Sequence, residues 1–277
     1  MKSMNQLLRM YLNITRTMNM EANINLDFSR IQTPLLEVIK ESNDNILFGL
    51  RVINEIEKLP DVRLEEQAAD FKKSGIRIEI GEPIRDLTQQ KEVFSSWLIK
   101  KGFEDLVKAI NLCVIEAYYI SQLYKLTGKT LLLAELEDEI KRIKKDSLDQ
   151  ANFPKLLDEK LNTGNMTYKE PAISINRVRN CLIHRNGIVT QEKDINDKIN
   201  NVLKLIYYSL DLIRLDENGK ETDRMENTNI GLMAKKKEKE FKVGEKIILT
   251  EQEFRGCLFT CHTFSIELTE IIKRNCV

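Results

Sequence analysis

A long, regularly spaced apolar seam between residues 99 and 124 limits the folds open to this chain more than any other feature. Apolar residues recur there at steps of four and three: Ile99, Phe103, Leu106, Ile110, Cys113, Ala117, Ile120 and Tyr124. This spacing places them along one side of an α-helix. A seam of this length requires a partner helix beside it, from the same chain or from a second copy.

The rest of the chain also favours helices, because its 277 residues include only five prolines and eleven glycines. Thr33-Pro34 is typical of a helix start, and that helix is expected to reach about Lys58. Thr250 and Glu253 have the spacing of a capping box that would open the last helix. The buried stripe of that helix would consist of Phe254, Cys257, Cys261, Phe264, Leu268 and Ile271.

Between these landmarks, further elements follow from the same periodicities. Helices are predicted over Leu131–Lys145 and Phe153–Leu161, and an amphipathic helix is predicted from Ile195, Ile199, Val202, Ile206, Leu210 and Ile213. A short strand is expected at Arg77–Gly81 and a small hairpin at Phe241–Leu249, around Gly244. Asp216–Asn229 is a polar break.

We therefore predict an all-α fold in three segments. A helical bundle would occupy residues 83–220, with an N-terminal helical extension over residues 1–82. Residues 221–277 would form the small hairpin and a last helix that packs on the bundle.

Charge and cysteine content narrow the function classes. The 43 basic and 43 acidic side chains cancel, which argues against a protein that coats nucleic acid but allows an enzyme that grips a few phosphates. No apolar run reaches the roughly 18 residues of a membrane span, and Met1–Met20 lacks the pattern of a secretion signal. The five cysteines fit reduced thiols in a helical core better than disulfides. We expect a cytoplasmic protein without a membrane partner.

Two other groupings are weaker indicators of function. Cys257, Cys261 and His262 lie close together, but no second Cys/His pair completes a tetrahedral metal site, so core packing is favoured and no metal or other cofactor is expected. Lysines crowd residues 235–242, interleaved with Glu238 and Glu240. A solvated linker is the default interpretation of that run, with RNA contact as the alternative.

The stretch Arg179-Asn180-Cys181-Leu182-Ile183-His184 is the one place where the sequence indicates a chemistry. It puts a permanent cation, an amide and an imidazole within about one and a half turns of an otherwise apolar helix. Pro171 is expected to open this helix, and Asn186-Gly187 to end it with a left-handed cap. Buried helix faces exclude Arg and His unless these residues have a partner or a function.

On an ideal helix, Asn176, Asn180 and His184 fall in one line, whereas Arg179 lies roughly 140° away from His184. The helix therefore carries a polar ridge beside an apolar one. Arg179 must either curl around the helix to share a site with His184 or meet a His from a second copy.

These residue types suit the cleavage of a phosphodiester. Metal-free RNA cleavage needs a base, an acid and positive charge near the phosphate. His184 could serve as base or acid, Arg179 could hold the phosphate through two hydrogen bonds, and Asn180 could orient His184 or bind a phosphate oxygen. Because one His cannot easily fill both proton roles, two copies of the motif across a two-fold axis would complete the set.

The run from Arg179 to Gly187 resembles the HEPN superfamily (higher eukaryotes and prokaryotes nucleotide-binding), whose signature is Arg, four to six residues, then His. The adjoining Asn180 and the Asn-Gly after the His are similar to prokaryotic HEPN ribonucleases of defence and toxin systems. The resemblance implies an antiparallel helical bundle that dimerises and brings two motifs into one metal-independent RNase cleft. It also implies Arg179, Asn180 and His184 as the catalytic set.

Asn176, Arg185 and Asn186 are the neighbouring polar residues expected to bind substrate. The expected enzyme is an endoribonuclease that cuts single-stranded RNA by transesterification through the 2′-hydroxyl. A toxin or antiviral role would follow, with a homodimer as the working unit and an antitoxin or other regulator as a possible partner.

Two alternatives stay open. Related HEPN domains include non-catalytic modules, so the same cleft could bind a nucleotide or a partner protein. Alternatively, Arg179 could extend to solvent and His184 could cap its own helix terminus, where the helix dipole favours a cation.

Overall fold

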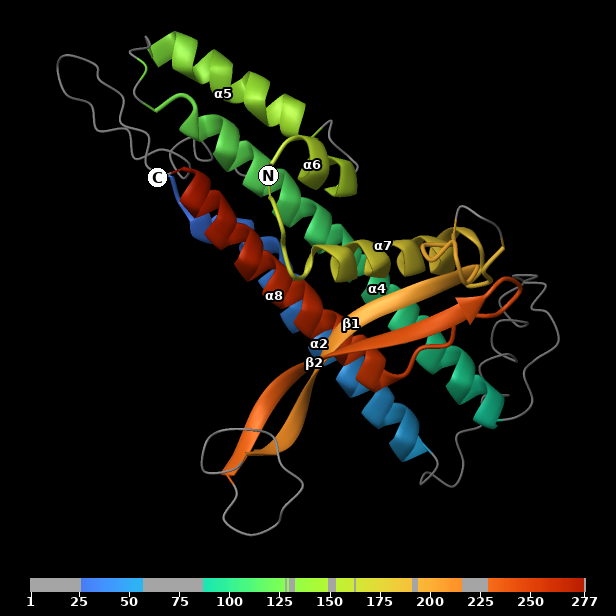
Figure 1. Cartoon of the computed structure of the whole chain (residues 1–277). Coiled ribbons are helices and arrows are strands. Elements are labelled where there is room, and N and C mark those ends of the chain that lie inside the picture. Colours follow the sequence, from blue (N-terminus) through green and yellow to red (C-terminus); the bar gives the residue numbers. More distant parts are fainter. Residues whose placement is uncertain are drawn as a thin grey trace, which may run out of the picture.

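The computed structural model describes residues 26–56, 87–127, 129, 133–148, 153–161, 163–190, 194–215 and 229–276. In these residues the protein is mostly helical and has one small two-stranded antiparallel sheet (Figure 1). A short 3-10 helix, η1 (Phe28–Ile31), leads into α2 (Thr33–Ile56), which confirms the predicted helix start. The predictions for Met1–Met20 and for a strand at Arg77–Gly81 lie outside the described residues.

The predicted seam lies on α4 (Leu87–Tyr124), the longest helix described. Helix α4 contacts α2, α5, α6, α7 and α8, so it is the central element of the fold. The seam residues from Ile99 to Ile120 are buried, and Tyr124 is half-buried, which confirms the need for neighbouring helices. Helices α2 and α8 lie beside α4 (Figure 1).

Part of α4, Lys91–Tyr124, is long and apolar enough to cross a membrane by length and composition alone. Most of this stretch is buried inside the protein, as the core helix of a folded domain would be. The seam side chains of this stretch pack against the other helices, whereas Val93, Phe94, Trp97 and Leu112 are exposed.

Helices α5 (Leu133–Leu148) and α6 (Phe153–Glu159) follow, close to the predicted bounds. Tyr119 and Leu123 of α4, with Leu126 in the turn that follows, pack against Leu136, Ile140 and Ile143 of α5 in a small separate cluster. By contrast, α6 inserts Phe153, Leu156 and Leu157 into the main core. The short helix α6 thereby becomes one wall of the region between α4 and α7.

The last helix, α8 (Glu251–Asn275), confirms the predicted capping box. Thr250 Oγ1 accepts from Glu253 N at 3.2 Å, and Glu253 Oε2 accepts from Thr250 N at 2.7 Å. Every residue of the predicted stripe, Phe254, Cys257, Cys261, Phe264, Leu268 and Ile271, is buried. All five cysteines of the chain are buried free thiols. The described parts of the three predicted segments share this single main core.

The amphipathic helix predicted from Ile195 to Ile213 is wrong. Residues Val202–Leu215 form strand β1, which pairs antiparallel with β2 (Asn229–Lys242). The first half of β1 lies between two helices, and side chains from both bind its backbone. Ser174 Oγ on α7 accepts from Ile206 N at 2.9 Å, and Thr260 Oγ1 on α8 accepts from Tyr208 N at 2.7 Å. These bonds satisfy the strand edge that β2 leaves open, so tertiary contacts decide the conformation.

Two other predictions for this region need correction. The basic run is part of β2, not a linker, and its lysines form ion pairs such as Lys237 Nζ–Asp211 Oδ2 at 3.0 Å. A small hairpin before the last helix is present, but β1 and β2 form it and not residues 241–249, because Phe241 pairs with Leu203. Gly244, with φ of 86°, instead turns the chain at the end of β2 towards Val189.

The far half of the β1–β2 hairpin extends away from the helices (Figure 1). Leu212 and Ile230 there are 75% and 76% exposed. The near half, by contrast, buries Val202, Leu203 and Leu205. The sheet is therefore a ribbon of which only one end is part of the core.

Candidate functional site

Helix α7 (Lys169–His184) carries the motif; a carboxylate of α8 binds the start of the helix, and a local cap closes its end. At the start, the Glu267 carboxylate of α8 accepts from Thr167 N at 2.8 Å and from Tyr168 N at 3.0 Å. This carboxylate replaces the missing N-cap side chain and complements the positive helix end. At the end, Asn186 and Gly187 have φ of 52° and 76°, and Gly187 N donates to Cys181 O at 3.1 Å, which confirms the predicted left-handed cap.

The buried face of α7 holds the helix against the core. Ala172, Ile175, Val178 and Cys181 are completely buried there. Positions 176, 179 and 180 lie three and four residues apart, so they share the adjoining face. All three are half-buried. The polar residues therefore lie at the edge of the core and are neither sealed in it nor fully exposed.

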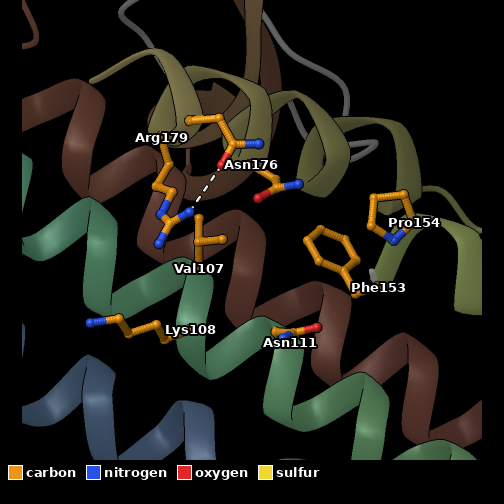
Figure 2. A pocket seen from close by; sticks show the side chains of 8 residues that line it. Val107, Lys108, Asn111, Phe153, Pro154, Asn176 and Arg179 are labelled. Carbon is orange, nitrogen blue, oxygen red and sulfur yellow. Dashed lines mark hydrogen bonds between the residues drawn. The ribbon is translucent and has the colours of Figure 1, made fainter. Parts of the chain in front are cut away.

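A cavity of about 310 Å³ opens at this edge, between α4, α6 and α7 (Figure 2). Its lining combines one guanidinium, one ammonium, three amides and an apolar wall. The lining residues are Val107, Lys108, Asn111, Phe153, Pro154, Asn176, Arg179 and Asn180. Figure 2 shows Arg179 reaching from α7 towards α4, with Phe153 and Pro154 at the other end. A space of this size can hold a small organic ligand.

The guanidinium of Arg179 has few partners for a half-buried cation. Its Nη1 donates to Oδ1 of the neighbouring Asn180 at 2.9 Å, and its Nε is buried without a hydrogen-bond partner in the described part of the chain. Among the described residues, no carboxylate lies within 4.0 Å of its nitrogens. Buried cations are normally paired. Arg179 therefore has donor capacity left for an anion.

Charges on α4 form the nearest ionic network. Lys108 Nζ donates to Glu104 Oε1 at 2.6 Å, and this bond lowers the pKa of Glu104, with the charges of Lys101 and Arg179 acting in the same direction. Lys108 is thus already neutralised in part. Arg179 interacts with Glu104 only through its charge and without a hydrogen bond, so it is less fully compensated than Lys108.

Asn111 of α4 also has an unpaired polar atom among the described residues. Its Oδ1 is buried and has no hydrogen-bond partner among the described residues. An unpaired buried acceptor costs about 1–3 kcal/mol. Two residues that line the cavity therefore each have a buried polar atom without a hydrogen-bond partner among the described residues, namely Nε of Arg179 and Oδ1 of Asn111.

The other motif residues lie outside this cavity. His184 is exposed in the last turn of α7, and its ring has no hydrogen-bond partner among the described residues. Arg185 Nε is 3.9 Å from Asp194 Oδ1, and Asn186 is an exposed cap residue. Within one chain, the structure brings Asn176, Arg179 and Asn180 together but leaves His184, Arg185 and Asn186 at the helix end. Their roles in catalysis and substrate binding stay predictions.

Neither a reactive thiol nor a metal centre emerges in the part of the chain that the structure describes. Burial raises the pKa of Cys113 to about 12 and that of Cys181, on α7 itself, to about 11, so both stay protonated at neutral pH. Cys257 and Cys261 lie in the core, as their stripe predicted. No three His, Cys, Asp or Glu side chains gather as potential metal ligands there.

Sequence reasoning missed the half of the cavity that other helices supply. Lys108 and Asn111 lie one turn apart on α4, on the flank of its apolar seam, and Phe153-Pro154 open α6. An amide between Ile110 and Cys113 of the seam was the available signal.

Comparison of the chain with protein-family models, with curated proteins and with solved structures finds no significant match.

Proposed function

We propose that the protein is an endoribonuclease of the HEPN type that cleaves single-stranded RNA without a metal. Arg179 would bind the scissile phosphate, Asn180 would hold the guanidinium in place, and His184 would transfer a proton. The bundle around α4 and α7 would be the HEPN-like domain. The 2′-hydroxyl would attack the adjacent phosphorus, the 5′-oxygen would leave with a proton, and a 2′,3′-cyclic phosphate would result.

The state of Arg179 is the observation that carries this proposal. Arg179 is half-buried at the edge of a polar cavity. Among the described residues its Nε has no hydrogen-bond partner, and its guanidinium makes one hydrogen bond, which Nη1 donates to Oδ1 of Asn180 on the same helix at 2.9 Å. A phosphate would supply the missing acceptors, and charge-assisted bonds to a guanidinium are strong and often bidentate.

A second copy of the chain completes the proposed site. The His184 side chain has no hydrogen-bond partner among the described residues and is exposed, so it is open to contact from outside. Two copies related by a two-fold axis would supply two imidazoles, one as base and one as acid. The proposed working unit is therefore a cytoplasmic homodimer in a toxin or antiviral system, restrained by an antitoxin or regulatory partner.

Incubation of the protein with single-stranded RNA in EDTA tests the proposal. Wild type should shorten the RNA, and Arg179→Ala should lower the rate by 100-fold or more, as expected for the loss of a charged transition-state contact. Arg177→Ala is the matched control, because Arg177 is an exposed arginine of the same helix that does not line the cavity. Equal RNA loss with both arginine variants would contradict the proposal.

The position of His184 favours one other candidate, a non-catalytic domain that binds a nucleotide. Because His184 does not line the cavity of its own chain, the cavity alone has a binding group but no proton donor of the imidazole type. If RNA stays intact with wild type while a nucleotide binds and Arg179→Ala abolishes that binding, this second function replaces the first.

A further inference from the structure

We propose that the cavity between α4, α6 and α7 is a subsite for one nucleotide, and that Asn111 of α4 is its specificity-determining residue. The phosphate would bind Arg179, and a hydroxyl or amino group of the sugar or base would bind the Asn111 amide. The inference rests on the proposed function only in that Arg179 binds phosphate.

The amide of Asn111 is suited to this role because it is unpaired. Its Oδ1 is buried with no partner among the described residues, although it belongs to a residue that lines the cavity. A half-turn about the last side-chain bond exchanges Oδ1 and Nδ2, so the amide can offer a ligand either an acceptor or a donor. The phosphodiester linkage of RNA carries acceptors and no donor, so the phosphate of the chain alone would leave the acceptor of Asn111 unused.

The other lining groups suit the remaining parts of a nucleotide. Asn176 and Asn180 place two more amides next to Arg179, and Val107, Phe153 and Pro154 form an apolar wall. Amides hydrogen-bond sugar hydroxyls and base edges, and apolar walls receive the ring faces. The volume of about 310 Å³ suits one nucleotide unit and not a longer stretch of RNA.

The inference is tested by calorimetric titration of the full-length protein with inorganic phosphate, with the four ribonucleoside 5′-monophosphates and with their 2′-deoxy forms. Wild type should bind at least one nucleotide ten or more times as tightly as inorganic phosphate. Asn111→Leu should remove about tenfold of that advantage, equivalent to about 1.4 kcal/mol, and leave phosphate affinity unchanged. The deoxy forms separate contact with the 2′-hydroxyl from contact with the base.

Gln122→Leu is the matched control. Gln122 is a half-buried amide on the same helix, two turns or more from the cavity, and its Oε1 already accepts from Lys125 Nζ at 3.1 Å. This variant should bind every ligand as wild type does. Asn111→Ala is a second replacement that removes the amide without adding bulk.

Three results would overturn the inference. The first is that wild type binds nucleotides and phosphate with equal affinity. The second is that both Asn111 variants keep the wild-type preference for nucleotides over phosphate. The third is that neither variant folds, which would make Asn111 a structural residue. The two proposals can fail separately. If the protein leaves RNA intact but its preference for nucleotides depends on Asn111, only the proposed nuclease activity is refuted. If cleavage depends on Arg179 but no such preference is measured, only the proposed subsite is refuted.

Discussion

Asn111→Leu should make the protein more stable while it weakens ligand binding. The wild-type amide keeps a buried acceptor without a partner among the described residues. Leucine removes that acceptor and has a higher helix propensity than asparagine, and position 111 lies inside α4. A residue that serves a ligand at the expense of the free protein is expected to show this trade-off.

The magnitude follows from three contributions. Removal of the unpaired acceptor should recover about 1–3 kcal/mol. Helix propensity adds a few tenths of a kcal/mol. The bulkier side chain could cost about 1 kcal/mol of strain in a tight core, but a cavity of about 310 Å³ adjoins the position and gives it space. We expect a net gain of about 1–2 kcal/mol, which corresponds to a rise in Tm of roughly 2–6 °C for a chain of this size.

Urea and thermal unfolding followed by circular dichroism measure this gain, with the m-value as a check that the unfolding transition is unchanged. Gln122→Leu should show no comparable gain, because its amide is already hydrogen-bonded. A loss of stability in Asn111→Leu would refute the reasoning, since it would show that the amide makes favourable contacts in the free protein.

Two further predictions concern the fold. In Gly102→Ala on α4, the new Cβ would lie 2.4 Å from Ile46 Cδ1 and 2.6 Å from Phe254 Cζ. The cost of overpacking, about 1–3 kcal/mol, should exceed the gain in helix propensity of about 1 kcal/mol, so the variant should be less stable. Higher stability of the variant in urea would contradict this packing. Hydrogen bonds from Asn200 lower the pKa of Asp197 to about 2 from its usual 3.8. The stability that the ionised carboxylate contributes is therefore present above about pH 4 and is lost as the pH falls through about 2. An NMR titration of the Asp197 carboxyl carbon should show this pKa and a higher one in Asn200→Ala; equal values would rule out the proposed cause.

The helices were predictable because their signals are local. The seam of α4 and the Thr250–Glu253 capping box each determine a conformation within a few residues. Strand β1 was not predictable, because the spacing of Ile206 and Leu210 suits a helix as well as a buried strand. The deciding bonds come from Ser174 and Thr260, which are 32 and more residues away along the chain.

The candidate site was predictable only along one helix. The spacing on α7 correctly put Asn176 beside Asn180 on one face, and the turn between Asn176 and Arg179 brings the guanidinium to the same cavity. That Asn111 and Phe153 lie opposite these α7 residues could not be predicted from the sequence, because it depends on how α4 and α6 pack against α7. The sequence also placed His184 in line with Asn180, whereas the cavity ends before the last turn.

The most direct test of the central claim is an end-group analysis of RNA cut in EDTA by wild type and by His184→Ala. His262→Ala is the control, because His262, on α8, is the other of the two histidines in the chain. The account predicts 2′,3′-cyclic phosphate ends from wild type and from His262→Ala, and intact RNA from a His184→Ala protein that light scattering shows to be still dimeric. Cyclic phosphate ends produced by His184→Ala at the wild-type rate would contradict it.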